Sequence, residues 1–102
     1  MKLPKVATDR LSSFHLYVLN LENLIEKERD AFFENLLEAG IGVNLHYIPV
    51  YLQPYYQELG FKKGLCPHAE DYYARAVTIP LFATLTAAEQ EKVIAAVKKY
   101  IK

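Results

Sequence analysis

Residues 43–56 read VNLHYIPVYLQPYY, and this stretch decides between an all-helical and a mixed fold. Three of its tyrosines are four residues apart, the spacing of one helix face: Tyr47, Tyr51 and Tyr55. Pro49 and Pro54 forbid a continuous helix here, because each lacks an N–H donor and pushes the preceding residue out of the α region. The stretch therefore predicts a strand that enters an irregular, ring-bearing loop.

Strand-like and helix-like patterns alternate along the rest of the chain. SSFHLYVLNL alternates with a period of two, as in a half-buried strand. The other expected elements are a helix over about 26–39, a strand over 41–47, one or two helical turns over 53–59, a short helix within 66–77, an extended piece over 77–82 and a last helix after Thr86. This order predicts an α+β fold in which a small, mostly antiparallel sheet of about three strands is covered by helices.

Local signals fix several boundaries and a candidate core. Gly40 is placed to end the first helix, and Thr86 with Glu89 forms a capping box at the start of the last one. Residues 1–10 lack a hydrophobic period and are interpreted as a linker, so residues 11–102 form the expected domain. The predicted core consists of Phe14, Phe32, Phe33, Leu36, Val93 and Val97.

Composition argues against several classes of function. The chain has 102 residues, enough for one domain, and 12 basic against 12 acidic side chains. Without a basic stripe, binding to nucleic acid or to an anionic membrane has no electrostatic support. No apolar run approaches the roughly 20 residues of a membrane span, and MKLPKVATDR lacks the apolar core of a signal peptide. With Cys66 as the single cysteine, we expect a cytoplasmic protein.

Metal and nucleophile sites have weak support. Cys66 and His68 flank a proline, and His46 lies elsewhere, but a zinc site usually needs four ligands at recognisable spacings. No nucleophile elbow or glycine-rich phosphate loop is present. We interpret Glu70 and Asp71 as charges that favour the start of a helix. No catalytic or metal-binding residue is therefore assigned.

The loop over residues 46–56 is the best candidate for a binding surface. A core prefers Leu, Ile or Val to Tyr, Gln and His, whose polar ends need partners. Two prolines stiffen the loop and lower the entropic cost of holding a binding geometry. Two readings stay open: the rings contact a ligand, or they plug a core. On these grounds the chain could also be a stand-alone α+β module that binds a ligand or a protein partner.

Two longer stretches carry a family resemblance. GIGVNLHYIPVYLQPYY and GLCPHAEDYYARAVTIPLFATLTAAEQEKVIAAV resemble the C-terminal small domain of the DegT/DnrJ/EryC1/StrS aminotransferases, which have the fold-type I architecture. Within the family, the chain most resembles the branch that acts on UDP-linked 4-keto-6-deoxy-hexosamines, including the pseudaminic acid and spore-coat polysaccharide enzymes. The resemblance implies a parent enzyme that uses pyridoxal 5'-phosphate to move an amino group, from L-glutamate, onto a 4-keto nucleotide sugar.

The resemblance also implies which residues act and which parts lie elsewhere. His46, Tyr47, Tyr51, Gln53 and Tyr55 match the segment that holds the nucleotide sugar. At position 51 many members have His, and Tyr cannot become a cation near neutral pH. The family's N-terminal large domain, which supplies the cofactor lysine, has no counterpart here. Lysines 62, 63, 92, 98, 99 and 102 match no cofactor motif, so we expect an inactive chain without bound cofactor. The resemblance also implies a homodimeric parent.

Overall fold

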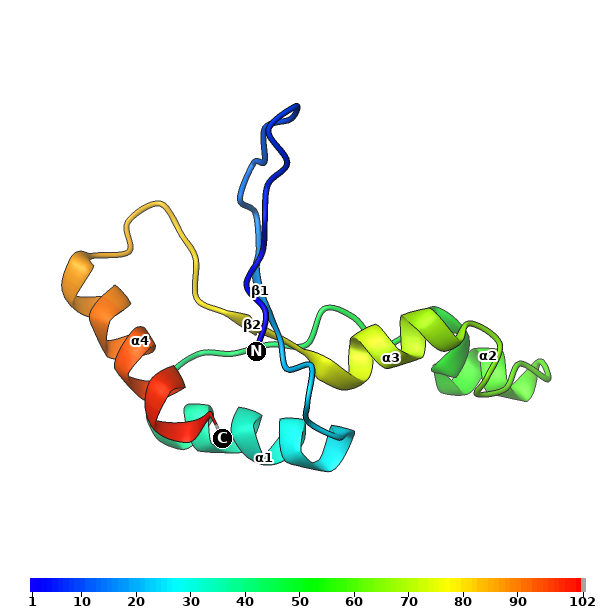
Figure 1. Ribbon diagram of the computed structural model, residues 1–102. Coiled ribbons are helices and arrows are strands. Elements are labelled where there is room, and N and C mark those ends of the chain that lie inside the picture. The colour runs from blue at the N-terminus through cyan, green and yellow to red at the C-terminus, as the bar shows by residue number, and fades with distance from the viewer. Residues whose placement is uncertain (102) are drawn as a thin grey trace.

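Two short antiparallel strands form the sheet of this computed structural model, which describes residues 1–101. Strand β1 spans Tyr17–Asn20 and strand β2 spans Ala76–Ile79. Leu19 lies opposite Val77, and cross-strand partners share one face of a sheet, so this pair directs two buried side chains to the same side. The two paired strands lie near the centre of the molecule (Figure 1).

Helices α1 (Glu26–Glu38) and α4 (Ala87–Tyr100) cover that face of the sheet. Phe32 and Leu36 lie one turn apart on α1, as do Val93 and Val97 on α4, so each helix presents one apolar stripe. The buried apolar core comprises Leu19, Leu21, Phe32, Leu36, Ile41, Val77, Val93 and Val97. Four of the six predicted core residues belong to it.

The expected helix ends are confirmed. Gly40 has a φ of 72°, the left-handed conformation that stops α1 at little steric cost. At the start of α4, the Thr86 hydroxyl accepts a hydrogen bond from the Glu89 N–H at 3.3 Å, and the Glu89 carboxylate accepts one from the Thr86 N–H at 2.8 Å. The capping box is therefore present in both directions.

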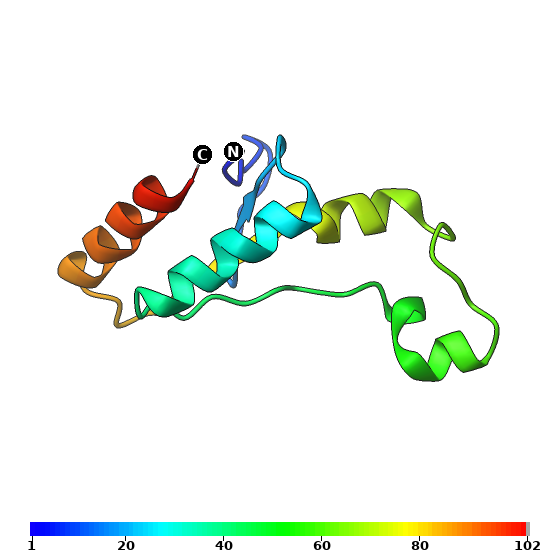
Figure 2. The same cartoon turned by 90° about the horizontal axis from the view of Figure 1, so that it is seen from below.

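A second group of elements extends away from this core. It comprises the 3-10 helix η1 (Val50–Leu52), α2 (Pro54–Glu58) and α3 (Pro67–Arg75), none of which contains a buried residue. We call residues 46–75 the tyrosine lobe. Figure 2 shows its η1–α2 end well separated from α4, at the far end of a long extended segment that follows α1.

Arg29 connects the lobe to the core. Its side chain is buried in α1, and its Nη1 donates a hydrogen bond to the Tyr73 carbonyl at 3.2 Å. The guanidinium carbon lies 5.0 Å from the centre of the Tyr73 ring, within cation–π range. The Asp30 Oδ1 lies 2.8 Å from the Arg29 Nε, so the carboxylate offsets the buried positive charge of the guanidinium. This contact fixes the base of α3 against α1.

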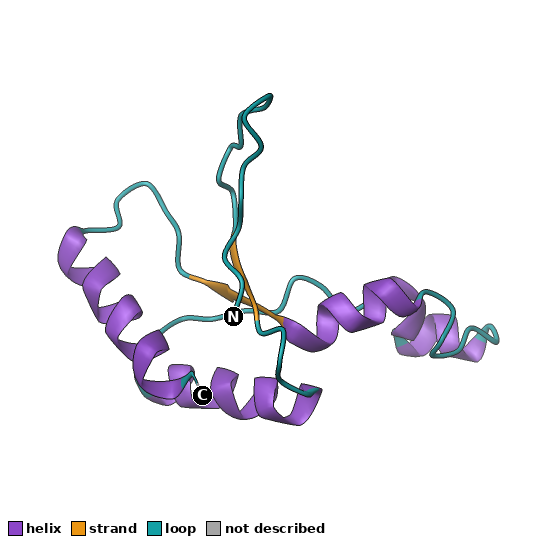
Figure 3. Cartoon of the chain, in the orientation of Figure 1, coloured by secondary structure: helices purple, strands orange, loops and turns teal. Residues whose placement is uncertain are grey.

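The α+β class is confirmed, but the expected third strand is not formed. Of the predicted strand over residues 41–47, only Asn44 pairs with the sheet, through an isolated bridge to Thr78. Two hydrogen bonds of 3.0 and 2.8 Å join their backbones. Gly42 weakens a strand at this point, and Pro49, which follows in the sequence, has no N–H to donate to a neighbouring strand. Figure 3 accordingly shows loop between α1 and the lobe.

Two predicted core residues lie outside the buried set. The prediction for Phe14 is wrong, because its side chain is 55% exposed on an arm that leaves the sheet before β1 begins. Phe33 is half-buried and packs against the core from the edge. Alternation could not decide which face of the strand is buried, and the structure buries the face of Leu19.

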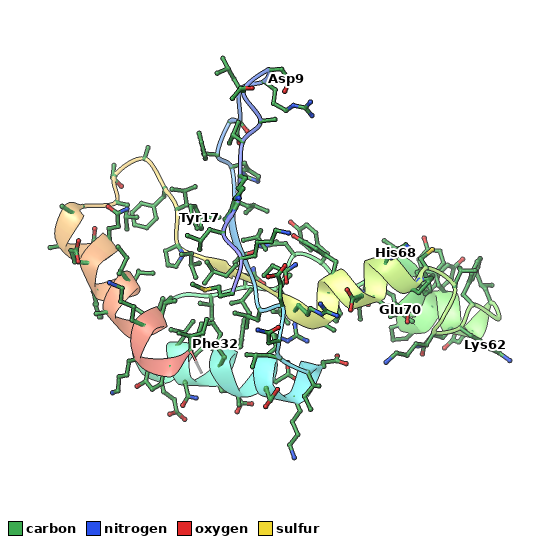
Figure 4. The ribbon with its side chains drawn as sticks, in the orientation of Figure 1. Asp9, Tyr17, Phe32, Lys62, His68 and Glu70 are labelled. Atoms are coloured by element: carbon green, nitrogen blue, oxygen red, sulfur yellow. The ribbon has the colours of Figure 1, made fainter. Side chains whose placement is uncertain are left out.

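Residues 1–16 form an arm that begins beside β1 and projects away from the sheet (Figure 1). Lys2 forms an isolated bridge with Asn20, with backbone hydrogen bonds of 2.7 and 3.0 Å. Beyond this bridge the chain reaches a tip near Asp9 and returns to β1 (Figure 4). Asp9 and Arg10 form an exposed ion pair at 2.9 Å, which lowers the pKa of the Asp9 carboxyl.

Candidate functional site

The tyrosine lobe begins where His46 attaches to the sheet. The His46 Nδ1 lies 2.9 Å from the Thr78 hydroxyl, within hydrogen-bond distance for either tautomer. Thr78 is buried, and its backbone pairs with Val18 on one side and with Asn44 on the other. Because the Thr78 backbone is paired on both sides, the hydrogen bond to its hydroxyl anchors the His46 ring to the sheet.

Tyr47 follows with its ring in solvent. Its side chain is 71% exposed, and its ring meets the His46 ring edge-on, with centroids 4.6 Å apart and planes at 83°. The peptide bond between the two residues is cis. A fixed imidazole therefore supports an exposed phenol, which is available for contact with a ligand.

Tyr51 is the centre of a hydrogen-bonded cluster inside the lobe. Its hydroxyl donates to the Glu70 carboxylate and accepts from the Cys66 N–H at 3.1 Å. The Cys66 carbonyl lies 3.3 Å away, but one hydroxyl donates only one hydrogen, and the charged carboxylate is the stronger acceptor. The same Glu70 oxygen accepts the Gly64 N–H at 2.6 Å.

This cluster shifts two pKa values. Burial raises the pKa of Tyr51 above its ordinary value, and the bond to the Glu70 carboxylate raises it further. That bond lowers the pKa of Glu70, with further lowering from the Gly64 N–H and the positive charge of Lys63. The cluster is therefore most stable with a neutral phenol and an ionised carboxylate.

Gln53 and Tyr55 lie at the start of α2. Gln53 is the N-cap residue, and its carbonyl accepts hydrogen bonds from the N–H groups of Tyr56 and Gln57 at 3.0 and 3.1 Å. Its side chain is exposed, as is that of Tyr55, which is 66% accessible. The Tyr55 and Tyr56 rings meet edge-on at 5.3 Å. The edge-on contact with the Tyr56 ring thus supports the exposed Tyr55 ring on the lobe surface.

The five predicted site residues therefore fall into two groups. Tyr47, Gln53 and Tyr55 are exposed, whereas His46 and Tyr51 have polar atoms engaged within the chain. The engaged pair occupies the attachment point and the centre of the lobe. Figure 4 shows Glu70 and His68 together in the lobe and Phe32 in the separate core.

An apolar groove lies elsewhere, between the sheet and α4. Its volume is about 320 Å³, and its walls include Leu19, Ile79, Val93 and Ile94. None of the five predicted site residues lines it. Its lining is mostly apolar, with Gln90 and Lys98 at its polar part, which suits an apolar surface better than the hydroxyl groups of a sugar. We therefore place the candidate site on the tyrosine lobe.

Other kinds of site find little support in residues 1–101. No three His, Cys, Asp or Glu side chains in this range gather as metal ligands. The lysines of this range are all exposed, whereas a cofactor-binding lysine is usually desolvated. Lys102 lies outside the described residues. No helix in the described range is long and apolar enough to cross a membrane.

Sequence reasoning missed the partners of the predicted residues. Thr78 was expected only as part of an extended piece, and Glu70 only as a helix-start charge. Both contact the site across long sequence separations, 32 residues for Thr78 with His46 and 19 for Glu70 with Tyr51. The one available signal was the presence of polar side chains beside an aromatic loop that needed partners.

Comparison with known proteins assigns the family. The profile of the DegT/DnrJ/EryC1/StrS aminotransferase family matches residues 1–98. The chain belongs to this family. It is 33% identical, over 105 aligned residues, to the spore coat polysaccharide biosynthesis protein SpsC of Bacillus subtilis, covering 97% of this chain and 26% of SpsC.

Solved structures agree with this assignment. The apo-form of Spr1654, a sugar aminotransferase of Streptococcus pneumoniae described as putative, superposes with a TM-score of 0.83 at 34% identity. The match covers 87% of this chain and 22% of Spr1654. Helicobacter pylori PseC, an aminotransferase of pseudoaminic acid biosynthesis, gives 0.77 at 28% identity, over 85% of this chain and 23% of PseC. The chain thus spans about a quarter of the length of these relatives.

Proposed function

We propose that this chain is the C-terminal domain of a pyridoxal-phosphate-dependent aminotransferase that acts on a 4-keto nucleotide sugar. In this proposal L-glutamate gives the amino group, the sugar is UDP-linked, and the product enters a surface polysaccharide or glycan. The family match and the relatives SpsC and PseC support the sugar class. The PLP-form and PMP-form structures of Spr1654 support the cofactor.

The observation that carries the proposal is the exposed polar aromatic surface of the lobe. A soluble domain gains little by leaving Tyr47 and Tyr55 about two-thirds accessible unless something covers them. Phenol and amide groups stack on rings and donate hydrogen bonds, which suits a nucleotide and a sugar. We assign Tyr47, Gln53 and Tyr55 to direct contact, and His46 and Tyr51 to the same site through their fixed positions.

The chemistry belongs to parts of the enzyme outside this chain. The exposure of the described lysines supports the proposal that the N-terminal large domain holds the cofactor and that this chain alone is inactive. Pyridoxal phosphate supplies the electron sink for amino transfer, while this domain binds and orients the sugar. We further propose that the whole enzyme is a cytoplasmic homodimer, in which other parts cover the exposed lobe.

Joining the chain to a large domain tests the proposal. The large domain of a relative such as SpsC, fused ahead of residue 1, should transfer an amino group from L-glutamate to a UDP-4-keto sugar. Neither half alone should do so. Product is measured by mass spectrometry. An active isolated chain contradicts the division of roles, and a folded, cofactor-loaded fusion that accepts no nucleotide sugar contradicts the substrate class.

A further inference from the structure

The Glu70 carboxylate joins three separate segments of the tyrosine lobe. One carboxylate oxygen takes the Tyr51 hydroxyl from η1 and the Gly64 N–H from the turn before α3. The Glu70 side chain itself rises from α3. These partners are 19 and 6 residues away along the chain, so their contact closes the loop between them.

The second half of the closure runs through Cys66. Its N–H donates to the Tyr51 oxygen at 3.1 Å, so this hydroxyl both gives and receives a hydrogen bond. Such chains polarise one another and fix the position of the phenol. The lobe otherwise lacks a packed core, because η1, α2 and α3 contain no buried residue. Ring contacts of Tyr56 with Tyr55 and Phe61 pack one end of the lobe. The polar cluster supplies the side-chain hydrogen bonds that join η1 to α3 and to the turn before it.

We propose that Glu70 is a positioning residue that holds the substrate-binding segment, residues 47–55, in a single geometry. Its carboxylate fixes Tyr51, which lies in the middle of that segment between the exposed Tyr47 and Tyr55. Lys63 is the nearby cation, and it favours the ionised form of Glu70. That this segment binds substrate rests on the proposed function, whereas its fixation by Glu70 does not.

A neutral amide separates the charge of Glu70 from its shape. Glu70→Gln keeps an acceptor oxygen for Gly64 and Tyr51 but loses the charge that strengthens both bonds. Glu70→Ala removes the acceptor altogether. Glu58→Gln is the matched control, because Glu58 ends α2 in the same lobe and makes no side-chain hydrogen bond or ion pair within the described residues.

Amide hydrogen exchange on the 102-residue chain tests the holding. We expect Gly64 and Cys66 to exchange at least about tenfold faster in Glu70→Ala, with a smaller change in Glu70→Gln and none in Glu58→Gln. The NMR signals of the Tyr47 and Tyr55 rings should shift with them, while those of Phe32 stay in place. Unchanged exchange at Gly64 and Cys66 in Glu70→Ala overturns the proposal. This result is independent of any substrate.

Steady-state kinetics of the fused enzyme test the consequence. Glu70→Gln should raise the KM for the nucleotide sugar by about 2- to 10-fold and leave kcat nearly unchanged, because only substrate contacts are disordered. The KM for L-glutamate should not move. Glu58→Gln should match wild type. An unaltered KM in Glu70→Ala, despite faster exchange at Gly64, shows that the segment's geometry does not matter to binding and overturns the positioning role.

Discussion

Replacing Phe32 by alanine tests the core most sharply, because Phe33 provides a matched control one residue away. Phe32 is 2% exposed within the cluster formed by α1, α4 and the sheet, whereas Phe33 packs on its edge. A buried Phe→Ala change costs about 3–5 kcal/mol in free energy of unfolding. Phe33→Ala removes the same atoms from a half-buried site and should cost about 1–2 kcal/mol.

Urea unfolding followed by circular dichroism measures the two costs. With an m-value of about 1–2 kcal/mol/M, Phe32→Ala should lower the midpoint by roughly 1.5–5 M. The total stability of a small domain is about 5–15 kcal/mol, so this variant can be largely unfolded in water. Phe32→Leu should lower the free energy of unfolding by only about 1–1.5 kcal/mol, so this variant stays folded and its urea midpoint can be measured. Equal midpoints for the two alanine variants, or a lower one for Phe33→Ala, refute the assigned helix face.

Three further outcomes follow from local geometry. Thr86→Ala should cost about 1 kcal/mol of unfolding free energy in urea, because the cap on Glu89 is lost, and an unchanged midpoint excludes that cap. Because the pKa of Glu70 is lowered in the folded chain, its ionised carboxylate stabilises the fold above its unfolded pKa, and this stabilisation is lost as pH falls through the folded pKa. Acid should therefore speed exchange of the Gly64 amide measured by NMR, and Glu70→Gln should flatten that pH dependence. Phe14→Ser should leave the melting temperature within about 2 °C, since Phe14 is exposed, and a larger drop would place it in a core after all.

Local sequence signals were enough to predict where most of the helices begin or end. Gly40 and the Thr86–Glu89 pair act within a few residues of themselves, so their effect is independent of the rest of the fold. The Pro49 and Pro54 argument also holds, because the backbone restriction of proline is local. The segment does avoid a continuous helix, and α2 begins at Pro54.

Contacts between residues far apart in the sequence could not be predicted from local patterns. Whether residues 41–47 pair with β2 depends on how far the backbones stay side by side, and only Asn44 meets Thr78. The period of two in the first strand is satisfied by either face, so the sequence could not show whether Phe14 or Leu19 is the buried side chain. The contacts of Tyr51 depend on a turn that returns Glu70 to it from 19 residues away, and no repeat or spacing encodes that return.

The lobe's role in binding the nucleotide sugar is tested most directly by separating the two half-reactions of the fused enzyme. Tyr47→Ala removes a ring that is 71% exposed, so folding should be unaffected. Tyr72→Ala, on the exposed side of α3, is the control for loss of a surface tyrosine. Stopped-flow absorbance follows amino transfer from L-glutamate and then to the UDP-4-keto sugar.

We predict that Tyr47→Ala slows the sugar half-reaction at subsaturating substrate by about 2- to 13-fold, the effect of losing one hydrogen bond worth roughly 0.5–1.5 kcal/mol. The glutamate half-reaction should stay within twofold of wild type, and Tyr72→Ala should change neither. Equal slowing of both half-reactions together with a lower melting temperature would show instead that residues 46–56 serve the architecture of the domain and do not bind the nucleotide sugar.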